Sequence, residues 1–101
     1  HELGLMKTDA LIVNTSRAEL IAPNALEQTL KAGRPGAAAV DVYESEPVSL
    51  PLALLRLENV LATPHIGFVE QDSYERYFRP AFEAIQHFVH GRPVNNIATK
   101  A

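Results

Sequence analysis

The sequence contains no cysteine and no tryptophan, and its only methionine is Met6. Without cysteine, the chain has neither disulfide bonds nor thiolate metal sites. No apolar run approaches the length of about 18 residues that a membrane-spanning helix needs, and no signal-peptide pattern is present. We therefore expect a cytoplasmic protein that does not interact with a membrane.

Charged residues of either sign are also few. The 101 residues include 9 Lys and Arg against 12 Asp and Glu, a formal net charge of −3. A nucleic-acid-binding surface would show as a basic patch, so we expect no nucleic-acid partner. Hydrophobic residues make up 47% of the chain, which is enough for one domain to bury a core.

Apolar strand and helix patterns alternate along the chain. Strands are expected at 10–14, 37–42 and 60–63, because these runs are short and almost wholly apolar, as in parallel strands buried on both faces. A helix is expected over 23–32, and a short helix or turn over 51–57. This order predicts an α/β fold with a parallel sheet and right-handed crossovers. The sheet is partial, since an average sheet has about five or six strands.

The first helix carries three local signals. Leu26 and Leu30 fall on one face, and Glu27 and Lys31 have the spacing of an i,i+4 ion pair. Gly33 is suited to the position just after a helix. These signals predict a helix that packs on the sheet through its leucines.

A second, longer helix is expected over about 69–90. Gly91 and Pro93 suit its end, and Pro80 inside the pattern should kink it or split it in two. Its apolar residues have the three-and-four spacing of an amphipathic helix. They are Tyr74, Tyr77, Phe78, Ala81, Phe82, Ile85, Phe88 and Val89.

Polar residues follow each of the three expected strands. Residues 14–17 (NTSR) follow the first, Asp41, Glu44 and Glu46 lie near the end of the second or just beyond it, and 63–65 (TPH) follow the third. In open parallel sheets, ligands bind beyond the carboxyl ends of the strands. The sequence therefore predicts that an arginine, carboxylates and a histidine meet at one sheet edge.

Each of these residues also has a purely structural alternative. Arg17 could be a surface residue, Asp41 could cap a backbone turn, Glu44 and Glu46 could be solvated loop charges, and His65 could be a half-buried imidazole. Their convergence at one edge is what favours a site.

A metal site is not expected. His87 and His90 are spaced i,i+3 on the long helix, but no third ligand accompanies them. A cation near the C-terminal end of a helix suits the helix dipole, so we interpret both histidines as structural.

The combination of Arg17, Glu46 and His65 supports a defined chemistry. An arginine binds a carboxylate through two charge-assisted contacts, and a histidine exchanges a proton with a hydroxyl or carbonyl oxygen. A carboxylate paired with that histidine fixes its tautomer. The trio suits reduction of a 2-keto acid, but it suits other acid–base chemistry on a carboxylate equally well.

Three blocks of the sequence resemble the D-isomer-specific 2-hydroxyacid dehydrogenases. Residues 6–17 (MKTDALIVNTSR) resemble the family signature, and 41–47 (DVYESEP) and 63–67 (TPHIG) its second and third blocks, in the same order and at matching intervals. The resemblance runs from Glu2 to about Val94.

The resemblance implies interconversion of a small 2-keto acid and a 2-hydroxy acid with NAD or NADP. Arg17 would bind the substrate's carboxylate and keto oxygen, His65 would be the general acid and base, and Glu46 would pair with His65. Asp41 would contact the nicotinamide end of the cofactor. The cofactor-binding residues implied by the resemblance are Thr15, Ser16, Arg17, Asp41, His65 and Gly67.

The sequence also departs from the family pattern. Ala18 stands where the family commonly has Gly or Pro, and Ala22 stands where it usually has an acidic or amide residue. No G-x-G-x-x-G phosphate loop occurs anywhere in the 101 residues. We interpret 1–68 as the second half of a Rossmann-type NAD-binding domain, and 69–101 as a C-terminal helix leading toward an absent substrate domain.

A half domain invites association. Family members are commonly homodimers, so we expect a homodimer or association with the missing half of the chain. The isolated fragment should turn over nothing. An inactive, truncated paralogue that serves as an oligomerisation or binding module is the alternative interpretation.

Overall fold

The computed structural model describes residues 1–49 and 51–94. The chain divides into two compact units, His1–Gly67 and Phe68–Ala101, and each is described by itself. The last part of the expected C-terminal segment, 95–101, lies outside the described residues.

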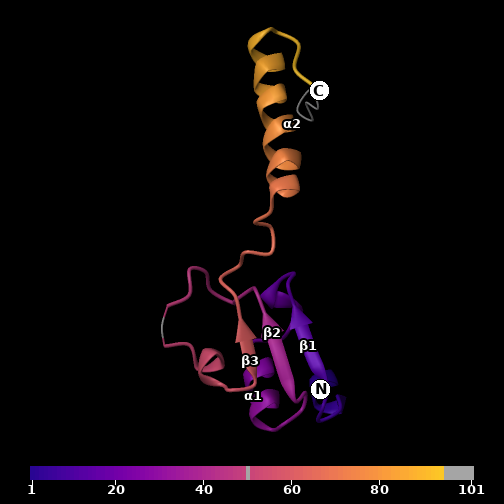
Figure 1. The fold of residues 1–101 in the computed structure, drawn as a ribbon, viewed down its shortest axis with the longest axis vertical. Helices are drawn as coiled ribbons and strands as arrows, with labels where there is room; N and C mark the ends of the chain where they lie inside the picture. Colours follow the sequence, from indigo (N-terminus) through magenta and orange to yellow (C-terminus); the bar gives the residue numbers. More distant parts are fainter. Residues whose placement is uncertain (50, 95–101) are drawn as a thin grey trace, which may run out of the picture. The chain divides into compact units, whose positions relative to one another are not determined.

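The first unit is built on a three-stranded parallel sheet (Figure 1). Its strands β1 (Leu11–Asn14), β2 (Ala37–Val40) and β3 (Val60–Ala62) lie in the order β1-β2-β3. Asn14 is in register with Val40, and Val40 with Ala62, so all three strands end at the same level. The expected α/β class with a partial parallel sheet is confirmed, and the polar residues that follow the strands start from one edge.

Helix α1 (Ala25–Lys31) connects β1 to β2 and is shorter than the expected 23–32. Asn24 has a left-handed φ of 60°, which delays the start of the helix. The expected ion pair is present, with Lys31 Nζ 2.5 Å from Glu27 Oε1. Gly33 follows the helix with a φ of 81°, a conformation that glycine adopts without a steric penalty.

Short 3₁₀ helices complete the first unit. They span Glu2–Leu5, Ala18–Leu20 and Ala53–Arg56, and the last lies within the stretch 51–57 for which a short helix or turn was expected. It packs on β3 and α1, so the connection between β2 and β3 covers the same face of the sheet as α1.

The core of this unit lies between α1 and one face of the sheet. Leu26 and Leu30 pack there against Ala38 and Val40, all at most 9% exposed. The opposite face carries the side chains that alternate with the core residues along the strands. The exposed members of that face are Leu11, Val13 and Leu61, at 59%, 57% and 68%.

The expectation that the strands are buried on both faces is therefore wrong for β1 and β3, whereas every residue of β2 is buried or half-buried. Apolar runs such as 10–14 are typical of strands covered on two sides, but the described part of this unit provides a helical layer for only one side.

The second unit contains helix α2 (Gln71–Val89). The helix is continuous through Pro80, so the expected split does not occur. A proline inside a helix removes one backbone donor, and the hydrogen bonds of the turns on either side hold the helix together. Gly91 follows it with a φ of 69°, and its N–H donates to the Phe88 carbonyl, as expected of a helix end.

Tyr74, Phe78 and Phe82 stack along one side of α2, with ring centroids 5.7 and 6.4 Å apart. No side chain of the helix is buried. Among the described residues, no helix is both long and apolar enough to cross a membrane.

Candidate active site

The turn after β1 is shaped by a side chain that the sequence analysis did not single out. Asn14 Nδ2 donates to the Arg17 carbonyl at 2.9 Å, and Asn14 Oδ1 accepts the Ser16 N–H at 3.1 Å. Asparagine commonly closes turns in this way, and that preference was the available sequence signal. The turn presents Thr15, Ser16 and Arg17 to solvent, with Arg17 Nη1 donating to the Ser16 carbonyl at 2.8 Å.

Asp41 follows β2 and is only 4% exposed. Its Oδ1 accepts hydrogen bonds from the Thr63 hydroxyl at 2.5 Å and the Ile66 N–H at 2.9 Å, and its Oδ2 accepts the Gly67 N–H at 2.8 Å. These bonds favour the charged carboxylate, so they lower the pKa of Asp41, with the Thr63 hydroxyl as the largest cause.

Glu46 and His65 form an ion pair across the same edge. Glu46 Oε2 lies 2.6 Å from His65 Nδ1, and Glu46 Oε1 accepts the Tyr43 N–H at 3.0 Å. The hydrogen bond from His65 is the largest cause of a lowered pKa of Glu46, and the positive charge of Arg17 contributes in the same direction. Both side chains are about a third exposed, at 36% for His65 and 35% for Glu46, so the pair is open to a ligand.

Tyr43 joins the two loops that carry this pair, and the sequence analysis did not assign it a role. Its hydroxyl donates to the Thr63 carbonyl at 2.6 Å. Partial burial raises the pKa of Tyr43, and the charges of Asp41 and Glu46 raise it further, so the phenol stays protonated and remains a donor. The position of Tyr43 between Asp41 and Glu44 was the signal available in the sequence.

The backbone of His65 is unusual. Its φ is 55°, in the left-handed region that residues other than glycine seldom occupy. Such conformations are held in place by their surroundings and gather at functional sites.

The predicted residues are thus brought together to different degrees. Hydrogen bonds link Asp41 to Gly67 and Glu46 to His65, and all four lie on two loops at the carboxyl edge of the sheet. Arg17 acts on this group through its charge, which contributes to the lowered pKa of Glu46. The geometry therefore combines a cationic group with a carboxylate–imidazole pair, as general acid–base chemistry on an anionic substrate requires.

Residues 1–67 match the family model described as "D-isomer specific 2-hydroxyacid dehydrogenase, NAD binding domain". The chain belongs to this family. The resemblance of the three sequence blocks is confirmed, and so is the expected class of cofactor.

Similar proteins carry related names. D-3-phosphoglycerate dehydrogenase from Archaeoglobus fulgidus is 38% identical over 91 residues, which cover 90% of this chain and 17% of that protein. A crystal structure described as a D-3-phosphoglycerate dehydrogenase oxidoreductase from Ralstonia solanacearum is 50% identical in sequence to this chain. The two structures match with a TM-score of 0.89 over 96% of this chain and 28% of that one.

A third similar protein is an acyclic imino acid reductase solved in complex with NADPH and D-Arg. It is 31% identical, with a TM-score of 0.73 over 92% of this chain and 29% of that one. The chain therefore spans less than a third of the length of each of these three proteins.

The residues present suit the nicotinamide end of the family's cofactor. A carboxylate offers roughly four acceptor positions, and Asp41 uses three, which leaves one for an amide N–H. No glycine-rich loop occurs in the 101 residues to cradle a pyrophosphate. The segment thus leaves one acceptor position of Asp41 for an amide and contains no glycine-rich loop for the phosphates.

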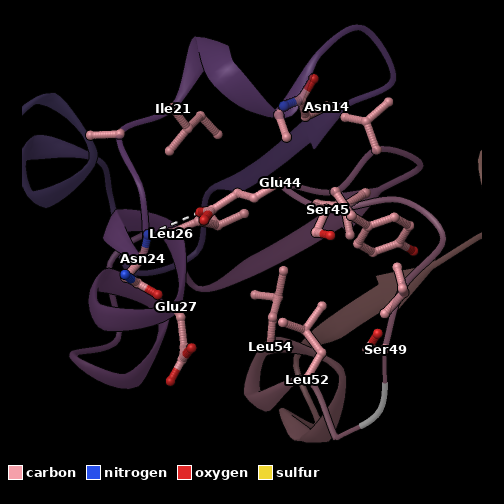
Figure 2. Close-up of a pocket in the computed structure, with 16 residues that line it drawn as sticks. Asn14, Ile21, Asn24, Leu26, Glu27, Glu44, Ser45, Ser49, Leu52 and Leu54 are labelled. Carbon is pink, nitrogen blue, oxygen red and sulfur yellow. Dashed lines mark hydrogen bonds between the residues drawn. The ribbon is translucent and has the colours of Figure 1, made fainter.

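A cavity of about 250 Å³ lies beside this site, on the α1 side of the sheet (Figure 2). Apolar side chains such as Leu26 and Val40 line it, together with Asn14 and Tyr43 of the site. Glu44 lies at this cavity, where its Oε1 accepts the Asn24 N–H at 3.0 Å. Glu44 is thereby separated from the acid–base pair, although it lies only two residues from Glu46.

Proposed function

We propose that the chain carries the acid–base residues of an oxidoreductase that interconverts a small 2-keto acid and a D-2-hydroxy acid. The observation that carries the proposal is the Glu46–His65 pair, 2.6 Å apart, at the carboxyl edge of a sheet that belongs to a dehydrogenase NAD-binding domain. The relative named D-3-phosphoglycerate dehydrogenase supports a 2-hydroxy acid as the class of substrate.

Arg17 would hold the substrate. Its guanidinium is exposed beyond the end of β1, and its planar donors match a carboxylate and an adjacent keto oxygen. Nη1 of Arg17 donates to the Ser16 carbonyl, and among residues 1–49 and 51–94 no second hydrogen bond holds the guanidinium, so its other donors are available to an anionic ligand.

His65 would move the proton. Because Nδ1 donates to Glu46, the second ring nitrogen, Nε2, is the atom that gives a proton to the keto oxygen in reduction and takes it back in oxidation. Glu46 accepts the Nδ1 hydrogen bond and thereby fixes the tautomer and the orientation of the ring. NAD(P)H, when bound, supplies the hydride.

The experiment that tests this role uses the protein expressed from its complete gene. NADH and NADPH oxidation would be followed with a panel of 2-keto acids, for the parent, His65→Ala and His87→Ala. We expect His65→Ala to lower kcat by about 100-fold or more, because a positioned general acid contributes roughly 10²–10⁴-fold. His87→Ala, an exposed residue of α2, should match the parent. Turnover of His65→Ala within tenfold of the parent would contradict the acid–base assignment.

A second candidate function is an inactive module that associates through its sheet. The observation that favours it is the exposed apolar face that includes Leu11, Val13 and Leu61. A gene product that dimerises but oxidises neither NADH nor NADPH with any 2-keto acid would support the module. Turnover by the parent would support the enzyme.

Within the enzyme, 1–68 would be the second half of the NAD-binding domain and 69–101 a helix leading toward the substrate domain. The homodimer, the association with a missing half and the cytoplasmic location stay predictions. Sedimentation of the complete gene product checks the homodimer.

A further inference from the structure

The Asp41 carboxylate joins the end of β2 to the segment that follows β3. Three donors distributed over 63–67 converge on it: the Thr63 hydroxyl, the Ile66 N–H and the Gly67 N–H. The carboxylate is 4% exposed, so these bonds are shielded from competing water. Asp41 thereby fixes both ends of a five-residue loop.

His65 lies at the centre of this loop, between the residues that Asp41 binds. Its left-handed φ of 55° is disfavoured for a residue with a side chain and needs support from the surrounding structure. That support comes from both sides, because Asp41 holds Thr63 before the histidine and Ile66 and Gly67 after it.

Gly67 shows how closely the loop approaches Asp41. A Cβ added at this position would lie 3.0 Å from Asp41 Oδ2, closer than ordinary van der Waals contact. A residue with a side chain would therefore require the loop or the carboxylate to shift.

We propose that Asp41 is a positioning residue for His65. By accepting the three hydrogen bonds, it holds the loop in the conformation that places His65 Nδ1 2.6 Å from Glu46 Oε2. The inference rests on the proposed function only for the role of His65 as acid and base. The loop geometry itself belongs to the chain without any cofactor.

The position of Asp41 requires a side chain with two oxygen atoms that both accept hydrogen bonds. All three groups that point at Asp41 are donors, and an ionised carboxylate is an acceptor at both oxygens. Asparagine would turn an NH₂ group toward at least one of these donors. The single acceptor position that remains on Asp41 lets it contact a nicotinamide amide as well, so holding the loop and contacting the cofactor are compatible.

The test measures amide hydrogen exchange and the His65 HN–Hα NOE in the full 101-residue chain, free of cofactor. In Asp41→Asn, exchange at Ile66 and Gly67 should rise about tenfold or more, and the strong intraresidue NOE of a positive φ should weaken. Exchange at Ala38, which donates to the Asn59 carbonyl in the sheet, should not change and reports that the fold is intact. Asp9→Asn, the same change at an exposed aspartate, is the matched control.

Two further variants keep the proposal open to refutation if Asp41→Asn does not fold. Thr63→Val removes one of the three donors, and Gly67→Ala places a methyl group 3.0 Å from Asp41 Oδ2. Both variants should therefore raise amide exchange at Ile66. Unchanged exchange and an unchanged NOE in the folded variants would overturn the proposal.

Kinetics of the complete gene product separate positioning from cofactor binding. Thr63→Val should lower kcat by about fivefold or more with the KM for NAD(P)H within twofold of the parent, because misplacement of a catalytic group acts on the chemical step. An unchanged kcat in Thr63→Val would show that Asp41 does not act through the loop. If the parent itself has no turnover, the proposed function fails, whereas the exchange measurements still decide the role of Asp41.

Discussion

Polar side chains of the candidate site bind backbone groups as well as each other. Asn14 accepts the Ser16 N–H, and Glu46 accepts the Tyr43 N–H while pairing with His65. Hydrogen bonds to charged groups are stronger than neutral ones and more sensitive to geometry. The site is consequently ordered by its own side chains before any ligand binds.

The ion pair predicts a measurable change at Glu46. His65 is the largest cause of its lowered pKa, so His65→Ala should let the pKa of Glu46 rise toward its ordinary value. A titration of the side-chain carboxyl carbon by NMR measures this directly. His90→Ala, in the other unit, should leave the Glu46 titration where it is, and an unshifted Glu46 in His65→Ala would contradict the pairing.

Asp41 predicts how stability depends on pH. Its pKa is lowered in the folded chain, so the stabilisation is fully present above the unfolded pKa of about 3.9 and is lost as the pH falls through the folded pKa. The free energy of unfolding, measured in urea between about pH 3 and 7, should therefore fall at the acidic end. Asp41→Asn should be less stable near neutrality and show a flatter acidic limb than the parent. Parallel curves for the two proteins would contradict this assignment.

Secondary-structure elements differ in how far local sequence determines them. Helix α1 forms where its leucine spacing and its Glu27–Lys31 pair predict it, but the start moves to Ala25 because Asn24 is left-handed. Helix α2 passes through Pro80 without the break that was one of the two outcomes predicted there. Local rules of this kind set the type of element better than its limits, because backbone contacts outside the element decide where it begins and ends.

The residue directly before β2, Gly36, is a glycine for a steric reason. A Cβ on Gly36 would meet the Thr8 carbonyl oxygen at 1.9 Å, a clash with backbone. Gly36→Ala should destabilise the fold by roughly 2–4 kcal/mol, in the upper range of single substitutions. Gly4→Ala, where a Cβ meets nothing within 4 Å, is the matched control and should change stability by less than about 0.5 kcal/mol. Urea unfolding of both variants checks the difference, and equal midpoints would contradict the clash.

For the molecule as a whole, the sequence contains no glycine-rich loop for the phosphates of a dinucleotide. We expect the 101-residue chain by itself to bind NAD with a Kd on the order of 1 mM, about −4 kcal/mol, because few of the cofactor's groups find partners. Isothermal titration calorimetry measures this, with Asp9→Asn, a change at an exposed aspartate outside the candidate site, as the control that should leave the Kd unchanged. Micromolar binding by the chain would contradict the expectation.

The sequence by itself determined the α/β class, the order of the elements and the family, because hydrophobic period and three spaced motifs are local properties of a chain. It also placed Arg17, Glu46 and His65 at one sheet edge, since parallel strands that alternate with helices end on the same side.

Only the tertiary structure decided what these residues touch. Asp41 had two interpretations in the sequence, a turn cap or a cofactor contact. Its bonds to the Ile66 and Gly67 N–H groups show that it caps the turn, and the cofactor contact, which is compatible with this, stays a prediction. Glu44 and Glu46, two residues apart, lie in different surroundings, and Tyr43 bridges two loops 20 residues apart. The physical reason is that a hydrogen bond forms only when donor and acceptor are placed to within a fraction of an ångström. Between segments far apart in the chain, packing sets that placement.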